Sequence, residues 1–165
     1  METRPKIKLT LSKTDKLLEG VSILALLVLW IITIYSYINL PQTIPSHFNA
    51  LGQIDHYGNK ESLLYLAITV TFLYALLTFI NNYPYIFNYS RSISVENAKK
   101  QYENATRMIR ILKVVLVIIF LDLTYMSYLT AIGKAKGLGI WFLPAAITLF
   151  SVPVIYAVLR SLRIK

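Results

Sequence analysis

Four long apolar runs limit the possible folds of this chain more than any other feature. They cover residues 20–38, 63–80, 114–132 and 138–159, and only the third contains a charged residue. A helix needs roughly 17–25 apolar residues to cross a bilayer, so each run is long enough to span it. The sequence therefore predicts an all-α polytopic membrane protein with four transmembrane helices, in which residues 1–165 form a single membrane domain.

The composition agrees with that prediction, because 56% of the side chains are hydrophobic and the mean hydropathy is +0.55. A soluble domain is typically about 45–50% apolar. The first run is longer than the ~7–15 apolar residues of a signal peptide, and no small-x-small cleavage site follows it. We therefore expect residues 20–38 to be an uncleaved first span.

The basic residues are distributed unevenly along the chain and predict its orientation. Residues 1–19 contain five Lys or Arg, residues 81–113 contain six, and the segment after the last run contains three. Residues 39–62 contain one, and residues 133–137 contain two. Because basic loops stay in the cytoplasm, both termini and residues 81–113 are expected inside, with residues 39–62 outside. The net charge of +9 is thus read as a signal of topology and of contact with the lipid bilayer, not of nucleic-acid binding.

The outer connection, residues 39–62, is long enough to have a function of its own. Pro41 and Pro45 favour extended backbone at the residues before them. The stretches 49–52 and 57–59 contain Asn and Gly and predict two turns. The chain has no cysteine, so neither disulfides nor thiolate-bound metals hold this segment. A compact, turn-rich extracytoplasmic cap on the membrane surface is expected.

Several polar side chains of this cap allow more than one interpretation. His47, Asp55 and His56 supply metal-binding groups, but their spacing matches no dense ligand motif, and no metal is assigned. Alternatively, His47, Asp55, Asn49 and Lys60 hydrogen-bond to one another and to the backbone, or they contact a ligand or peptide directly. No catalytic constellation or cofactor fingerprint stands out, so an enzyme is not predicted and no cofactor is expected.

Asp122 is the single acidic residue within the four runs. A carboxylate at the centre of a bilayer is costly, and such residues usually face the interior of a helix bundle. Tyr125, one helical turn further on, could donate a hydrogen bond to it. Two roles remain open: a protonated Asp that joins helices through hydrogen bonds, or a group that binds a ligand, an ion or a proton.

The inner connection, residues 81–113, divides into an irregular part and a helix. Pro84 ends the second span, and Ser94 is a candidate N-cap. Apolar residues then recur at a spacing of three to four, which predicts an amphipathic helix that continues unbroken to Ile132. This stripe consists of Val95, Ala98, Tyr102, Ala105, Ile109 and Leu112. A Gly-Lys-Ala-Lys-Gly turn at 133–137 makes the last two spans antiparallel. Aromatic residues near the expected outer boundary of the membrane are interpreted as an interfacial belt rather than as an aromatic ligand-binding site.

Residues 40–60 also resemble a known sequence signature. The stretch LPQTIPSHFNALGQIDHYGNK is similar to the pattern L-P-x-x-I-P-x-H-F-N-x-x-G-x-x-D-x-Y-G-x-K of a bacterial membrane family of unknown function. That family includes the immunity protein against the sporulation-delaying-protein toxin. The matching residues are Leu40, Pro41, Ile44, Pro45, His47, Phe48, Asn49, Gly52, Asp55, Tyr57, Gly58 and Lys60.

A second segment, FNYSRSISVENAKKQYENATRMIRILK, resembles the cytoplasmic N-Y-P…E-N-A…Q-Y segment of the same family. Ser90 departs from the family's usual proline. The matching residues are Asn88, Tyr89, Glu96, Asn97, Ala98, Gln101 and Tyr102. For the immunity relative, the resemblance implies a protein that blocks a secreted peptide toxin and captures a transcriptional repressor at the membrane. That relative has further spans after the shared portion.

Together these patterns predict a small sensor or immunity-type protein of the bacterial cytoplasmic membrane. Its cap would contact an extracytoplasmic peptide or small ligand, Asp122 would respond to occupancy, and the inner helix would meet a cytoplasmic partner. The alternative is a structural accessory subunit that binds another membrane protein through the cap. A transporter component is a weaker alternative, and a homo-oligomer is compatible with all three.

Overall fold

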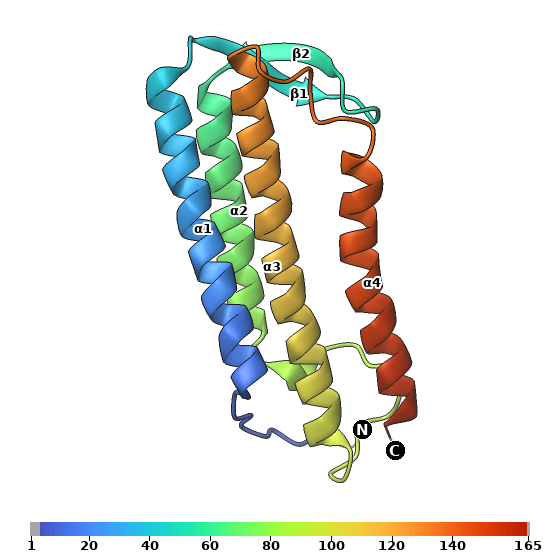
Figure 1. Cartoon of the computed structure of the whole chain (residues 1–165). Coiled ribbons are helices and arrows are strands. Elements are labelled where there is room, and N and C mark those ends of the chain that lie inside the picture. Colours follow the sequence, from blue (N-terminus) through green and yellow to red (C-terminus); the bar gives the residue numbers. More distant parts are fainter. Residues whose placement is uncertain (1–3, 165) are drawn as a thin grey trace.

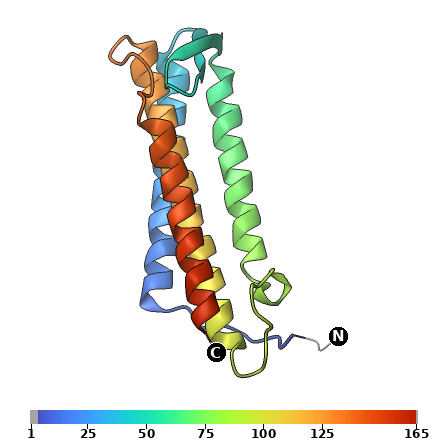
Figure 2. The same ribbon diagram turned by 90° about the vertical axis from the view of Figure 1, so that its right-hand side faces the viewer.

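A computed structural model describes residues 4–164 and consists of four long helices with a small hairpin at one end (Figure 1). The elements in chain order are α1 (Lys13–Asn39), β1 (Thr43–Phe48), β2 (Ile54–Asn59), α2 (Glu61–Ile80), the short 3₁₀ helix η1 (Pro84–Ile86), α3 (Ala98–Ala131) and α4 (Phe142–Arg163). The hairpin and the α3–α4 loop lie at one end of the bundle, and both chain ends lie at the other (Figures 1 and 2).

Helix α3 is the centre of the bundle, because it packs against α1, α2 and α4. Leu29 of α1, Val70 of α2 and Val117 of α3 are fully buried and form the main apolar cluster. Helix α4 packs chiefly on α3 and stands away from α1 and α2 in Figure 1. Most of α4 is therefore exposed to whatever surrounds the protein.

Polar side chains link the helices within this apolar packing. The indole Nε1 of Trp30 donates to Thr71 Oγ1 at 3.0 Å, which joins α1 to α2. Gln101 Nε2 donates to the Ser161 carbonyl at 3.0 Å, and Asn104 Nδ2 donates to the Ala157 carbonyl at 2.8 Å. Such bonds are effective between membrane helices, where apolar contact gives little preference for protein over lipid. The bonds from Gln101 and Asn104 hold the C-terminal half of α4 against α3.

Three helices, α1, α2 and α4, are long and apolar enough to cross a membrane. The third apolar run lies within α3, which continues without a break for 34 residues as the sequence predicts. The crossing of the bilayer by residues 114–132, and the orientation of the termini, stay predictions. The expected antiparallel arrangement of the last two helices is confirmed by their course in both views (Figures 1 and 2).

The connection between α1 and α2 is a β-hairpin, so the mostly helical fold also contains a small two-stranded sheet, which the prediction of an all-α fold with a turn-rich cap did not include. Thr43 pairs with Asn59 and Phe48 with Ile54 in antiparallel register, with an irregularity around His47. Ile44 is fully buried beneath the hairpin, in a cluster with Leu40 and Leu63. The pairing joins residues from six (Phe48 and Ile54) to sixteen (Thr43 and Asn59) positions apart, and turn and proline signals do not reveal its register.

Two predicted helix boundaries also need correction. Helix α3 begins at Ala98, four residues after Ser94. Residues 94–97 form a turn instead, in which the Ser94 amide donates to Asn97 Oδ1 at 3.1 Å. Helix α4 begins at Phe142 rather than near Leu138. Gly137 and Gly139 have φ values of +135° and +80°, which are incompatible with a right-handed helix.

The N-terminal segment before α1 is tethered to the bundle. Arg4 Nη1 donates to the carbonyls of Tyr85 and Phe87, and the Tyr102 hydroxyl donates to the Pro5 carbonyl at 3.1 Å. Ser12 then caps α1 through a capping box with Asp15. Residues 4–11 thus cross the open end of the bundle and help to enclose a cavity there.

Candidate functional sites at the two ends of the bundle

The turn of the hairpin is organised by Asn49. Its Oδ1 accepts hydrogen bonds from the amides of Leu51 and Gln53 at 2.9 and 3.0 Å. Gly52 adopts φ +72°, and its carbonyl accepts from the Leu138 amide at 2.8 Å, which attaches the turn to the α3–α4 loop. An asparagine that folds its own turn in this way is typical of Asx geometry. Asn49 and Gly52 therefore shape the hairpin, whether or not they also contact a ligand.

The charged residues of the hairpin also satisfy local partners. His47 Nδ1 lies 2.6 Å from Asp55 Oδ1, and both side chains are exposed. Lys60 Nζ donates to the Leu40 carbonyl at 3.2 Å and lies 4.9 Å from the centre of the Tyr37 ring. This matches the interpretation in which cap residues hydrogen-bond to one another and to the backbone. Within residues 4–164, no group of three His, Asp or Glu side chains is arranged to hold a metal ion.

A groove lies directly beneath the hairpin and has a volume of about 560 Å³. Its residues come from the hairpin and from three helices or their ends. They are Ser46, His47, Phe48, Asn49, Ala50, Leu66, Leu123, Ser127, Leu138, Phe142 and Leu143. The wall is mostly apolar, with His47, Asn49 and two serine hydroxyls as polar groups, which is typical of small-ligand sites. Three residues of the sequence signature, His47, Phe48 and Asn49, thus share one groove.

The remaining cap candidates do not line this groove. Pro45 is buried beneath the hairpin, Pro41 is exposed beside the end of α1, and Tyr57 is exposed on the outer strand. The hairpin therefore has an outer face with Tyr57 and an inner face over the groove. Sequence spacing alone does not separate these two groups, because the irregularity at His47 shifts the alternation of the strand.

Asp122 does not face the interior of the bundle, so that expectation was wrong. Its side chain is exposed, as are those of Ile118 and Tyr125 on the same face of α3. The neighbouring helices cover the opposite sides of α3, where Val117 and Thr124 are fully buried. Among the described residues, no hydrogen bond joins Tyr125 to Asp122.

Most candidates in the inner segment serve the fold of the bundle. Gln101 and Tyr102 are fully buried, and Asn97 is 9% exposed. Burial raises the pKa of the Tyr89 hydroxyl, which donates to the Pro84 carbonyl at 2.8 Å. Only Asn88 and Glu96 of this group are exposed. The resemblance to the inner segment of the family therefore reflects, in this chain, residues that hold the loop and α4 in place.

A cluster of buried charges at the other end was not predicted from the sequence. Glu19 of α1 faces two basic residues of α3: Oε2 accepts from Lys113 Nζ at 2.6 Å, and Oε1 lies 3.1 Å from Arg110 Nε. Lys113 is fully buried, also donates to Thr78 Oγ1 at 2.9 Å, and lies 4.7 Å from the centre of the Tyr74 ring. Two cations thus share one carboxylate.

A second ion pair lies one helical turn nearer the start of α1. Arg107 Nε donates to Asp15 Oδ1 at 2.9 Å. Burial alone would raise the pKa of the Asp15 carboxyl, but the hydrogen bonds from Arg107 and Ser12 outweigh it and lower that pKa to about 2. Arg107, Arg110 and Lys113 follow one another at a spacing of three, which is a helical signal visible in the sequence. Their acidic partners lie more than 90 residues away and could not be identified there.

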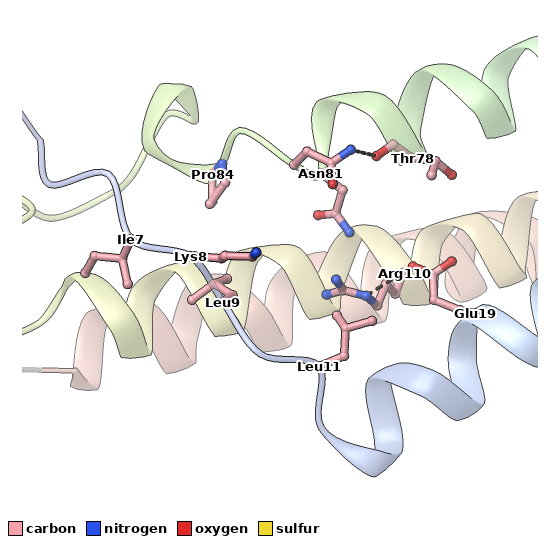
Figure 3. Close-up of a pocket in the computed structure, with 10 residues that line it drawn as sticks. Ile7, Lys8, Leu9, Leu11, Glu19, Thr78, Asn81, Pro84 and Arg110 are labelled. Carbon is pink, nitrogen blue, oxygen red and sulfur yellow. Dashed lines mark hydrogen bonds and ion pairs between the residues drawn. The ribbon is translucent and has the colours of Figure 1, made fainter.

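These charges border a cavity of about 320 Å³ at the end of the bundle opposite the hairpin (Figure 3). Its wall is made by the N-terminal segment, the ends of α1 and α2, and α3. The lining residues are Ile7, Lys8, Leu9, Leu11, Glu19, Thr78, Asn81, Asn82, Pro84 and Arg110. The cavity is therefore partly apolar and partly cationic.

Comparison with known proteins relates the part of this structure around the hairpin to other chains. Residues 24–72 match a family model described as "Domain of unknown function (DUF1648)". The match includes most of α1, the whole hairpin and the first part of α2, and so contains the residues 40–60 discussed above. The chain is thus similar, over this region, to a family whose function is undefined.

One curated relative shares a longer region. It is described as "Uncharacterized protein" from Archaeoglobus fulgidus, and it is 34% identical over 86 residues. The alignment covers 47% of this chain and 47% of the relative, so the chain spans about half the length of that protein. The relative is archaeal, so the similarity is not confined to bacteria. No solved structure matches the chain.

Proposed function

We propose that this chain is a four-span membrane protein of the sensor or immunity type, with both termini in the cytoplasm and the hairpin outside. The groove beneath the hairpin contacts an extracytoplasmic peptide or small ligand. The observation that carries this proposal is the convergence of His47, Phe48 and Asn49 with residues of α2, α3 and α4 around one largely apolar groove. A bacterial host and a relation to toxin immunity rest on the resemblance of residues 40–60.

The groove provides a physical route for a signal through the bundle. Leu66, Ser127 and Phe142 belong to three different helices, or lie at their ends, and all line it. A ligand that fills the groove would contact all three and favour one arrangement of α4 relative to α3. Because α4 packs chiefly on α3, its position is the least constrained part of the bundle. Asp122 is not part of this proposed route, since its side chain is exposed elsewhere on α3.

The natural absence of cysteine allows one experiment to test both orientation and groove. Cysteine is placed at Ala50, which lines the groove, or at Leu51, its neighbour in the turn, which does not. Both residues are exposed, so a bulky membrane-impermeant maleimide added to intact cells is expected to label both variants. The adduct at position 50 should then abolish protection of a sensitive bacterium against the sporulation-delaying-protein toxin, whereas the adduct at position 51 should preserve it.

The outcomes separate the parts of the proposal. Labelling that requires permeabilised cells would contradict the orientation. Equal protection with both adducts would contradict a role for the groove. A host in which the unmodified chain gives no protection, although it reaches the membrane in normal amounts, would contradict the immunity function.

A second candidate function, an accessory subunit of a membrane complex, is favoured by the exposed position of Asp122. If α3 crosses the bilayer, an exposed carboxyl group in its central part needs a hydrogen-bonding partner from another protein. Tyr125 lies on the same face and is 46% exposed, so the two groups offer an acceptor and a donor side by side. This face is then the docking surface, in place of the cap.

Substitution of Asp122 tests this alternative. Asp122→Leu is expected to weaken association with a co-purifying membrane protein by roughly five- to thirtyfold, since a hydrogen bond between membrane helices is worth about 1–2 kcal/mol. Asp122→Asn keeps hydrogen-bonding capacity and serves as the matched control. Association is measured by purification in mild detergent with identification of stoichiometric partners. A wild-type protein that purifies alone, with the same mass as the Asp122→Leu variant, would refute the accessory-subunit role.

A further inference from the structure

The cavity at the end of the bundle opposite the hairpin is lined by more basic than acidic side chains. Its walls contain three polar groups of particular interest: the Arg110 guanidinium, the Lys8 ammonium group and the Asn81 amide (Figure 3). Arg110 comes from the middle part of α3, Lys8 from the N-terminal segment, and Asn81 from the end of α2. The close-up shows the Arg110 and Lys8 side chains extending into the same space from opposite sides (Figure 3).

Positive charge is in excess around this space. Glu19 is the acidic residue of the lining, and it already accepts a 2.6 Å hydrogen bond from the fully buried Lys113. Arg110 therefore shares that single carboxylate with another cation. Lys8 forms no ion pair with any acidic residue in the described part of the chain. Two cations that face one another without an intervening acid repel each other, and an anion between them would remove that repulsion.

The donors of Arg110 point to the same conclusion. Its side chain is 9% exposed, and its Nε–H is enclosed 3.1 Å from Glu19 Oε1 without forming a hydrogen bond. An unsatisfied buried donor costs about 1–3 kcal/mol in general, so this arrangement favours an added acceptor. A guanidinium presents its N–H groups in a planar fork that suits phosphate and carboxylate oxygens.

Asn81 adds a further requirement for the ligand. Its Nδ2 donates to the Thr106 carbonyl at 3.2 Å, which sets the orientation of the amide. Its Oδ1 is then left buried without a donor. A carboxylate has no proton to offer this oxygen, whereas a hydroxyl group does. The cavity thus combines donors for an anion with an acceptor for a hydroxyl.

We propose that this cavity binds a phosphate group together with a hydroxyl of the same molecule. Arg110 and Lys8 contact the phosphate oxygens, and Asn81 Oδ1 accepts from the hydroxyl. A volume of about 320 Å³ accommodates a phosphate with its nearest substituents. Two sources have this chemistry: soluble phosphate, which carries its own hydroxyl at neutral pH, and the headgroup of phosphatidylglycerol at the inner leaflet.

The test uses the full chain reconstituted in phosphatidylcholine nanodiscs, in buffer that lacks phosphate. In one arm inorganic phosphate is titrated, and binding is followed by ³¹P NMR and by the thermal unfolding midpoint. In the other arm, phosphatidylglycerol replaces part of the phosphatidylcholine, and the same midpoint is measured. Phosphatidylcholine has a phosphate but no hydroxyl, so it is the lipid control.

Lys8→Gln is the principal variant, because Lys8 is exposed and its loss leaves the buried cluster intact. It is expected to weaken the response to the effective probe roughly tenfold. Lys6→Gln removes the same charge from the same segment, but Lys6 lies over the Tyr85 ring and does not line the cavity. The response of that control should change less than twofold.

The possible results assign the source or overturn the site. A Lys8-dependent response to inorganic phosphate identifies soluble phosphate, and a Lys8-dependent response confined to phosphatidylglycerol identifies the lipid. No response in either arm overturns the site. An equal loss with Lys6→Gln and Lys8→Gln also overturns it, because attraction to a basic surface then accounts for the binding.

Discussion

Glu19→Gln is expected to lower the free energy of unfolding by about 3 kcal/mol or more, since loss of one partner from a buried ion pair leaves an uncompensated charge. Here the uncompensated charges are Lys113, which is fully buried, and Arg110, which is 8% exposed. After the substitution, Lys113 Nζ keeps Thr78 Oγ1 as a hydrogen-bond partner and loses its counter-charge. The change is measured by denaturant unfolding of the purified protein in detergent micelles, followed by circular dichroism.

Two further variants distinguish a charge effect from a general loss of packing. Glu96→Gln removes an acidic residue that is exposed and unpaired among the described residues, so it should change stability by less than about 0.5 kcal/mol. The double variant Glu19→Gln/Lys113→Met removes both members of the pair and should recover part of the loss, because apolar replacements of buried pairs are often tolerated. A Glu19→Gln protein as stable as the wild type would show that the cluster is hydrated in solution.

Gly52→Ala is expected to detach the hairpin from the α3–α4 loop and to destabilise the protein by about 3 kcal/mol. Gly52 has φ +72°, and a Cβ there would meet the Gly139 carbonyl oxygen and lie 2.6 Å from the Gly139 nitrogen. Both contacts are with backbone, which cannot rotate away as a side chain can. The hydrogen bond from the Leu138 amide to the Gly52 carbonyl should break with this displacement.

Gly133→Ala is the matched control for this effect. Gly133 has nearly the same φ, +74°, but a Cβ there meets no atom within 4 Å. It should therefore show only the conformational penalty of about 1–2 kcal/mol for a left-handed residue. Hydrogen exchange at the Leu138 amide reports the hairpin attachment directly and should accelerate in Gly52→Ala alone. Equal stability and equal exchange in the two variants would contradict the close approach of the two loops.

The structure also relates these two expected effects to the proposed sites. Glu19 lies beside the cavity opposite the hairpin, and Gly52 holds the turn of the hairpin above the groove. The two regions are at opposite ends of α3, which is one continuous helix of 34 residues. A rigid helix of this kind can connect the two proposed sites, and a measured change at one end upon binding at the other would demonstrate coupling between them.

The number of long helices, their approximate positions and the presence of a distinct segment between the first two follow from the amino-acid sequence alone. These features are local, because length, apolar composition and turn residues act within one stretch of chain. The long helix through residues 98–131 followed from its unbroken periodicity. The importance of residues 40–60 followed from their departure from that apolar pattern.

Which side chains contact one another depends on how the helices pack and is not readable from the sequence. The pairing of β1 with β2, the exposed face that holds Asp122, and the burial of Gln101 against α4 depend on which surfaces of the helices pack together. The contact of Glu19 with Lys113 joins residues 94 positions apart. Local residue preferences do not predict such contacts, because the contacts contribute free energy only when segments far apart in the sequence pack together and exclude water.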